Sequence, residues 1–383
     1  MQDAAAPAPL DEHARPNLFE IDLGAIASFA RNIRKLVGPD AKIFAALKCN
    51  AYGFGLVPVA RAVAAAGIDA VSVVDRADAI ELRQAGISIP ILVYPGSLAN
   101  AAAVAAAETY GLIPTLVDLR SAEIYSRLAT RPLDVAVKVD TGQERLGFPA
   151  EEAADAIAAI SRMPSLRVRI VNSHPNVPSP PSLEYLKWQF QRFEAVCRRL
   201  DQLGIDVPIR MVASSKILAV LGRLAFNAVD PGQMFFGPFQ EEGDVPWPTA
   251  RQPLRKISSR LIHLRSLSRT EFQKEAPFPV RPGTRMGIVP IGSADGGSRI
   301  HAGEVLVRGR RARFLSGASL EHMRIDLTEI PEAELGDEVV FVGEQGGDTI
   351  TPEAVVAHQP LQRVTDIAMA VGSRIPRRYL EAE

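Results

Sequence analysis

Residues 42–55 read KIFAALKCNAYGFG, an aliphatic run followed at once by a lysine, a tyrosine and two glycines. A short, continuous apolar run predicts a buried strand of a parallel sheet. In a parallel β/α barrel the carboxyl ends of the strands carry the functional side chains, and Lys48 stands at such an end. A lysine partly removed from water has a lowered pKa and can form a Schiff base. The alternative is an ordinary surface lysine that closes a strand.

The loop after Lys48 has the composition of a phosphate-binding turn. Tyr52, Gly53 and Gly55 follow within a few residues. Glycines let a phosphate approach backbone amides closely, and one phenol adds a hydrogen-bond donor. We therefore expect this loop to lie at a binding site.

Short aliphatic runs alternate with amphipathic stretches from about residue 18 to residue 237. Three of the expected helices end at a glycine, at Gly67, Gly86 and Gly204, as left-handed helix ends require. The alternation predicts an α/β fold with an N-terminal (β/α)8 TIM-type barrel, and a doubly wound open sheet is the alternative. The expected strands are 19–21, 42–47, 70–74, 89–94, 113–117, 134–139, 168–172 and 208–212, of which the first can belong elsewhere.

The pattern of the sequence changes after about Pro246. Strand-like runs at 285–290, 304–307 and 338–342 are separated by glycine-rich turns, and long helical patterns are few. This predicts a smaller, mostly-β C-terminal domain. We therefore expect a disordered leader over 1–16, a barrel domain over 17–245 and a C-terminal β domain over 246–383.

Composition narrows the class of protein. The chain has 383 residues, a formal net charge of −1 and two cysteines. A balanced charge disfavours non-specific nucleic-acid binding, which needs a basic surface. Two cysteines cannot form a disulfide framework, and no apolar run reaches the length of a membrane span. We expect a cytoplasmic protein with no nucleic-acid or membrane partner, and no motif suggests a metal site.

The motif KCNAYGFG resembles the pyridoxal-phosphate signature of the alanine racemase family, which normally reads K-A-N-A-Y-G-H-G. The similarity extends from LFEIDLGAI near the start to SRIPRR near the end. It implies an N-terminal barrel, a C-terminal β domain and a head-to-tail homodimer with shared active sites. It also implies that pyridoxal 5'-phosphate is the cofactor, that Lys48 holds it as a Schiff base and serves as one acid/base, and that Tyr52 contacts its phosphate.

Further motifs share the order and spacing of the family. In KVDTGQERLGF, Lys138 matches a lysine that is often carbamylated, and Arg145 matches an arginine near the phenolic oxygen of the cofactor. Without the resemblance, Lys138 and Asp140 could form a simple strand-end ion pair. His174 matches the histidine that stacks on the pyridine ring.

The phosphate end and the substrate end are matched too. Ser214 and Ser215 in MVASSK, with Gly232 and Gln233, occupy the positions of the phosphate contacts in the family. Either serine could instead be an ordinary helix N-cap. In SLEHMRID, Leu320 stands where a methionine amide of the family binds the substrate carboxylate.

Asp230, in NAVDPGQMFFG, departs from the family pattern. Alanine racemases place an arginine here, against the pyridine nitrogen. An aspartate would pair with a protonated ring nitrogen and strengthen the cofactor as an electron sink. The D-P-G sequence is also similar to the E-P-G of barrel-type amino-acid decarboxylases. Alternatively, Asp230 only begins the turn at Pro231 and Gly232.

The second catalytic group also departs from the pattern. The chain has six tyrosines, none of them between Leu186 and Arg378. At the position of the second catalytic tyrosine of the family stands Lys274, which could replace the phenol or be an exposed loop charge. Ser293 and Ser373 replace two further tyrosines, so the pocket should be wider or differently polar than an alanine pocket.

Three functions follow from these observations. The first is a pyridoxal-phosphate racemase or epimerase of this family, acting at the Cα of an amino acid with non-alanine or altered specificity. The second is a one-base reaction on the same scaffold, as in a decarboxylase, aldolase or transaminase. The third is a non-catalytic pyridoxal-phosphate-binding relative.

Overall fold

The computed structural model describes residues 14–222, 226–237, 251–268, 275–279, 281–361 and 363–381. The chain divides into two compact units, which we describe separately. Leu23–Gln252 form one unit, and the segment up to Asp22 forms the other together with Pro253–Glu381. Within the described ranges, no helix combines the length and the apolar character needed to cross a membrane.

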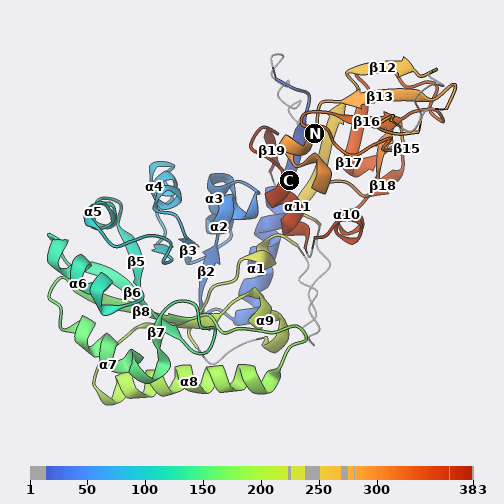
Figure 1. Cartoon of the computed structure of the whole chain (residues 1–383). Helices are drawn as coiled ribbons and strands as arrows, with labels where there is room; N and C mark the ends of the chain where they lie inside the picture. The colour runs from blue at the N-terminus through green and yellow to red at the C-terminus, as the bar shows by residue number, and fades with distance from the viewer. Residues whose placement is uncertain are drawn as a thin grey trace, which may run out of the picture. The chain divides into compact units, whose positions relative to one another are not determined.

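The first unit is a closed parallel barrel, as predicted (Figure 1). β10 pairs with both β9 and β2, and β5 pairs with β6, so the ring of strands has no open edge. This closure excludes the doubly wound open sheet. The barrel strands are β2 (Lys42–Ala46), β3 (Ala70–Val73), β4 (Ile91–Val93), β5 (Leu112–Leu116), β6 (Leu133–Asp140), β8 (Leu166–Ser173), β9 (Ile209–Ala213) and β10 (Ala228–Val229), and β7 (Phe148–Pro149) adds a short pairing to β6.

Helices surround this barrel on its outer side (Figure 1). The expected glycine ends are confirmed, because Gly67, Gly86 and Gly204 have φ values of 86°, 85° and 67°. The helices are α1 (Leu23–Val37), α3 (Leu56–Ala65), α4 (Arg76–Gln84), α5 (Ala101–Tyr110), α6 (Leu119–Leu128), α7 (Ala150–Ser161), α8 (Leu183–Gln202) and α9 (Ser215–Leu221), with α2 (Lys48–Tyr52) as a short turn after β2.

One expected barrel strand was wrong. The run 19–21 forms β1 (Leu18–Asp22), which pairs antiparallel with β11 (Leu254–Arg260) and parallel with β19 (Arg377–Leu380) in the other unit. The eighth barrel strand is instead β10, which is only two residues long. A strand this short gives no periodic signal, so the pattern of the sequence could not reveal it.

The interior of the barrel positions a polar layer. Small and aliphatic side chains fill the barrel, among them Ala70, Leu92, Ala136, Ile170 and Ala228. Because side chains alternate along an extended chain, the residue two positions further on points the same way. At the end of each of these strands, the next inward-facing residue is polar. These residues are Ser72, Tyr94, Lys138, Asn172 and Asp230.

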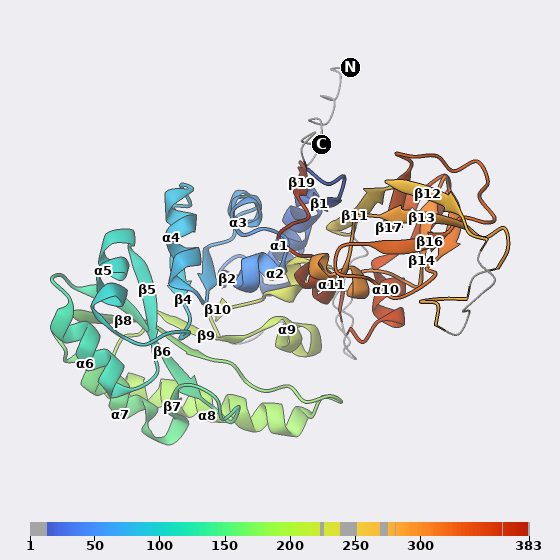
Figure 2. The same cartoon turned by 45° about the horizontal axis from the view of Figure 1, so that its top comes forward.

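The second unit is mostly β, as predicted (Figure 2). One sheet has the order β15-β14-β17-β11-β1-β19, with β18 beside β17, and a second sheet has the order β12-β13-β16. Further bounds are β12 (His263–Ser266), β13 (Arg285–Val289), β14 (Glu304–Val307), β15 (Arg310–Arg313), β16 (Met323–Asp326), β17 (Glu338–Gln345), β18 (Asp348–Ile350), α10 (Pro352–His358) and α11 (Val364–Ala370).

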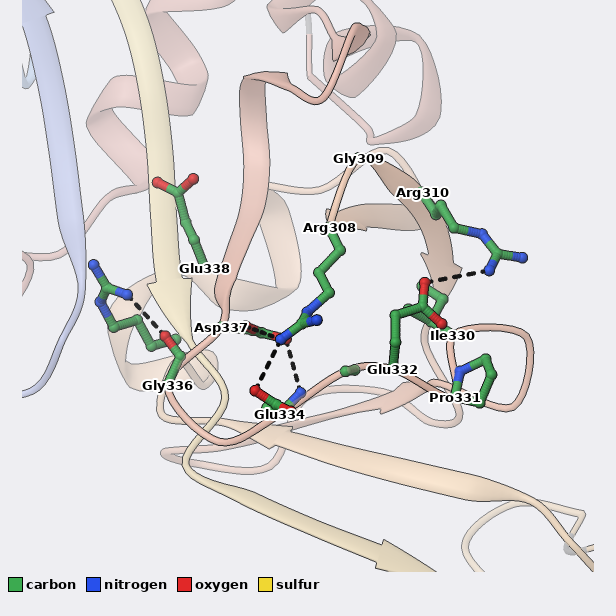
Figure 3. Close-up of polar contacts among 12 residues, drawn as sticks. Arg308, Gly309, Arg310, Ile330, Pro331, Glu332, Glu334, Gly336, Asp337 and Glu338 are labelled. Atoms are coloured by element: carbon green, nitrogen blue, oxygen red, sulfur yellow. Dashed lines mark hydrogen bonds and ion pairs between the residues drawn. The ribbon is translucent and has the colours of Figure 1, made fainter.

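The hairpin between β14 and β15 has a two-residue turn that also carries two ion pairs. Arg308 and Gly309 have positive φ values of 50° and 74°, as the two central residues of a tight hairpin require. Arg308 pairs with Asp337 at 2.5 Å and with Glu334 at 3.1 Å (Figure 3). These partly exposed pairs link the turn to the segment before β17 and add little stability.

Candidate functional site

A left-handed turn directly follows Lys48. Cys49, Asn50, Ala51 and Tyr52 have φ values between 51° and 56°, a region that non-glycine residues rarely adopt. Each such residue costs about 1–2 kcal/mol. The side-chain oxygen of Asn50 accepts a hydrogen bond from the backbone N–H of Leu56 at 2.7 Å and so holds the turn in place. A strained backbone that is retained next to a lysine is typical of a functional site.

Lys48 lies in a largely buried and charged environment. Burial lowers the pKa of its amine, and nearby Arg145 lowers it further, whereas Asp230 acts in the opposite direction. The Nζ atom lies 4.9 Å from the centroid of the Tyr94 ring. A lowered pKa makes more of the amine neutral and therefore able to accept a proton.

Asp230 is a buried member of this layer, with a relative exposure of 6%. Its Oδ2 accepts a hydrogen bond from the Tyr94 hydroxyl at 2.8 Å, and Ser72 Oγ donates to the same phenolic oxygen at 3.1 Å. Its Oδ1 is buried and has no hydrogen-bond partner. Burial raises the pKa of Asp230, against the opposing effects of Lys138, Lys48 and the Tyr94 hydrogen bond.

Lys138 is a second buried lysine of the same layer. Burial lowers its pKa to about 8, and the charges of Lys48 and Arg145 act in the same direction. Asp230 partly offsets these effects. Two lysines with lowered pKa values beside one buried carboxyl group make this layer a candidate for acid/base chemistry.

The loop after β6 is organised by Asp140. Its Oδ1 accepts from the backbone N–H of Gly142, Gln143 and Glu144 at 2.9, 2.9 and 3.1 Å. Its Oδ2 accepts from the backbone N–H of Arg145 at 2.9 Å. Burial would raise the pKa of Asp140, but these four bonds outweigh burial and lower it. The carboxylate thereby fixes the position of the Arg145 backbone.

Helix α8 anchors this loop from a second direction. The Tyr185 hydroxyl donates to the Gly142 carbonyl oxygen at 2.5 Å. A Cβ atom on Gly142 would lie 2.5 Å from the Trp188 ring, so only glycine fits there. The exposed side chain of Arg145 therefore extends from a doubly held loop.

Asn172 is a candidate site residue that the sequence pattern did not reveal. It is paired in register with Lys138, is 1% exposed, and has neither a donor nor an acceptor partner for its amide atoms. Tyr94 was missed as well. One feature of the sequence could have revealed both residues. Each is the polar residue that ends a mainly aliphatic run, ILVY or RIVN, and each stands two positions after an inward-facing residue.

His174 follows β8 and is held neutral. Burial lowers its pKa to about 3, and the charges of Lys138, Lys48 and Arg145 lower it further. A neutral ring suits a stacking contact or a hydrogen-bonding role rather than one as a positive charge.

The residues expected at a phosphate lie together. A Cβ atom on Gly232 would lie 3.0 Å from Tyr52 Cζ, so glycine allows the phenol to approach the backbone. Ser215 Oγ accepts from the N–H groups of Gly232 at 2.9 Å and Met234 at 3.3 Å. Ser214 precedes α9 as its N-cap, and Gln233 begins the 3-10 turn η1 (Gln233–Phe235).

Two expected site residues are not in this layer. Lys274 lies outside the described residues. Leu320 belongs to the second unit, where its side chain is 69% exposed and its carbonyl accepts from the Ala294 N–H at 3.0 Å. Both remain predictions.

The barrel layer has a donor set that fits pyridoxal 5'-phosphate. Lys48 offers an amine, the unpartnered Oδ1 of Asp230 offers an acceptor for a ring N–H, and the hydroxyls of Tyr52 and Ser215, beside Gly232, are candidate donors to a phosphate. The two unpartnered atoms of Asn172 also call for a polar ligand. In the described part of the chain, no cluster of three or more His, Cys, Asp or Glu residues is suited to a metal ion.

Comparisons with known proteins agree with this picture over both units. The family models described as "Alanine racemase, N-terminal domain" and "Alanine racemase, C-terminal domain" match residues 21–239 and 257–379. An alanine racemase of Desulforamulus reducens is 31% identical over 376 residues, covering 95% of this chain and 99% of its own. The alanine racemase of Halothermothrix orenii is 29% identical, covering 95% and 97%. The crystal structure of alanine racemase from E. faecalis is similar with a TM-score of 0.85 at 27% identity, covering 97% of this chain and all of that one.

Proposed function

The chain belongs to the alanine racemase family, and we propose that it uses pyridoxal 5'-phosphate to racemise an amino acid at Cα, with Lys48 as the lysine that binds the cofactor. One observation carries the assignment to this site. Lys48 lies at the carboxyl end of a closed barrel, in a layer where the buried Asp230 has an unpartnered Oδ1. A lysine and a carboxylate in this arrangement suit the two ends of the pyridoxal ring system.

Racemisation requires a proton to leave Cα on one face and return on the other. When bound, pyridoxal phosphate supplies the electron sink that acidifies the Cα–H bond. Lys48 serves one face, because burial lowers the pKa of its amine and so makes more of the amine neutral and able to accept a proton. Arg145 would orient the reacting end, and Asp230 would face the ring nitrogen. His174, held neutral by its lowered pKa, would contact the ring without adding charge.

The second base comes, in this proposal, from a second copy of the chain. The family resemblance favours a head-to-tail homodimer in which the partner's Lys274 serves the other face and Leu320 contributes its backbone amide. We keep a barrel domain and a β domain in this proposal, but move β1 from the predicted barrel domain of 17–245 to the β domain and place the later boundary between Gln252 and Pro253 instead of at 245/246. With serines at 293 and 373 in place of tyrosines, we propose an altered specificity rather than alanine alone. Both cysteines are free thiols, which supports a cytoplasmic location.

Deuterium exchange tests the reaction. The purified protein is incubated in heavy water with a panel of L- and D-amino acids, and products are read for handedness and mass. Exchange with inversion supports racemisation. Lys48→Ala should abolish the absorbance of the bound cofactor, and persistence of that absorbance would refute Lys48. Lys274→Ala should remove inversion but spare exchange from one enantiomer, whereas unchanged racemisation would eliminate Lys274.

Asp230 favours a second candidate, a one-base reaction such as decarboxylation, aldol cleavage or transamination. A carboxylate at the ring nitrogen strengthens the electron sink, and these reactions use a strong sink. In the same assay, mass loss or a keto acid would identify them. Cofactor absorbance without exchange from any amino acid would leave a non-catalytic binder.

A further inference from the structure

A chain of hydrogen bonds crosses the mouth of the barrel and ends on Asp230. Ser72 belongs to β3, Tyr94 follows β4, and Asp230 follows β10. Ser72 Oγ donates to Tyr94 Oη at 3.1 Å, and Tyr94 Oη donates to Asp230 Oδ2 at 2.8 Å. The strand order β4-β3-β2-β10 means that the Tyr94 side chain reaches past β2, where its ring lies 4.9 Å from Lys48 Nζ.

We propose that Tyr94 is a positioning residue that keeps the proton of the Asp230–cofactor pair on the pyridine nitrogen. The inference rests on the proposed function, because it requires that Asp230 face that nitrogen. Tyr94 binds Oδ2, whereas Oδ1 has no partner and is therefore the acceptor that we assign to a ring N–H. Tyr94 thus determines which oxygen of the carboxyl group faces the ligand.

The direction of the effect follows from acid–base chemistry. A hydrogen bond donated to a carboxylate stabilises its ionised form, and the Tyr94 bond does so for Asp230. Without it, the carboxylate is a stronger base and draws the proton from the ring nitrogen. The ion pair of carboxylate and protonated ring then gives way to a neutral pair, and the electron sink is weaker.

Ser72 acts through Tyr94 rather than directly on Asp230. Its hydroxyl donates to the phenolic oxygen, which makes the phenol a better donor toward Oδ2. The buried Tyr94 phenol has a pKa raised well above its usual value, by burial and by the charge of Asp230, so it keeps its proton and remains a donor. The chain therefore runs in one direction, from Ser72 to Asp230.

Other charged and titratable groups around the pair must be held constant in any test. They are Lys48 and Tyr52 on α2, Lys138 on β6, Arg145 on the loop after β6, and His174 after β8. The variants proposed below alter none of them.

Nitrogen-15 NMR of the holoenzyme, loaded with cofactor labelled at the pyridine nitrogen, tests the proposal. We expect the wild-type spectrum at about pH 7.5 to show a protonated ring nitrogen. In Tyr94→Phe the ratio of protonated to unprotonated nitrogen should fall by about tenfold or more, as for loss of a hydrogen bond to a charged group. Ser72→Ala should shift it in the same direction by less.

Tyr125→Phe is the matched control. Tyr125 is a buried phenol on α6 that lines the same cavity of about 60 Å³ as Tyr94, and the structure gives it no bond to Asp230. Its variant should leave the nitrogen signal unchanged. If Tyr94→Phe cannot be loaded with cofactor, Ser72→Ala decides the question alone, because it leaves the phenol in place.

The outcomes separate this inference from the proposed function. A wild-type protein that binds no pyridoxal phosphate refutes both. A loaded wild-type enzyme whose ring nitrogen is unprotonated overturns the inference only. The inference alone is also overturned if the ring nitrogen is protonated to the same extent in Tyr94→Phe and in Ser72→Ala as in the wild type.

Discussion

Replacement of Asp140 by asparagine tests how the Arg145 loop is held. In the wild type, one carboxylate accepts four backbone hydrogen bonds, three on Oδ1 and one on Oδ2. The amide introduced at this position can keep the three bonds as neutral ones, but its NH₂ group would face the Arg145 N–H, donor against donor. The substitution therefore weakens three bonds and loses one.

The size of the effect follows from these bonds. A hydrogen bond to a charged group contributes about 1.5–3 kcal/mol and a neutral one about 1 kcal/mol. Because Asp140 is only half-buried, water replaces part of what is lost. We expect the free energy of unfolding of Asp140→Asn to fall by about 2–4 kcal/mol at pH 7.

The direction of the pKa shift of Asp140 determines how the free energy of unfolding depends on pH. The backbone bonds hold the pKa of Asp140 below its ordinary value in the folded protein. The contribution of Asp140 to the free energy of unfolding is therefore complete above the pKa of the unfolded state, about 3.9. It is lost as the pH falls through the lower pKa of the folded state. The difference between wild type and variant should be full at pH 7 and should shrink only below about pH 4.

Urea unfolding followed by circular dichroism measures this difference. Asp134→Asn is the control, because Asp134 lies on the same strand and pairs with Arg167 at 2.8 Å on the exposed surface. That variant should lose less than about 1 kcal/mol. Equal losses in the two variants, or a difference that does not change with pH, would refute the role given to Asp140.

Three further predictions concern the barrel layer. Gly232→Ala should weaken pyridoxal-phosphate binding at least about tenfold in a fluorescence titration, because its Cβ would meet Tyr52; Gly317→Ala, with open space around it, is the control. Asn172→Leu should raise the melting temperature of the apoprotein, since it removes two unpartnered buried atoms, and should reduce the added stability that the cofactor gives; a lower apo melting temperature would contradict this. Lys138 should remain an unmodified amine, so carbon-13 NMR in labelled bicarbonate should show no carbamate in the wild type but one in Asp230→Asn.

The barrel could be predicted because its strands are buried on both faces and so appear as continuous aliphatic runs. The two failures have different causes. β1 has the same apolar character but pairs in the second unit, and β10 is too short to show a pattern. Pairing partners are properties of the folded chain, and local composition does not encode them.

The part of the site that could be predicted consists of residues whose own side-chain type indicates a chemical role. Lys48, Lys138 and Asp230 meet in one layer, as the family resemblance implies. Tyr94 and Asn172 were missed because a polar residue at the end of an aliphatic run is ordinary in itself. Their importance arises only from contacts between strands distant in sequence, such as the bond from Tyr94 to Asp230.

Charge balance explains why an aspartate can stand at position 230. The layer already holds Lys48 and Lys138, with Arg145 close enough to lower both of their pKa values. An arginine at 230 would add a further cation, which a carbamate on Lys138 could neutralise. Asp230 supplies that negative charge itself and raises the pKa of Lys138. A carbamate beside it would place two anions together in a buried site, where like charges repel strongly. The pKa of about 8 leaves enough neutral amine for carbamate formation, so its absence would reflect the charge of Asp230 and not protonation of the lysine.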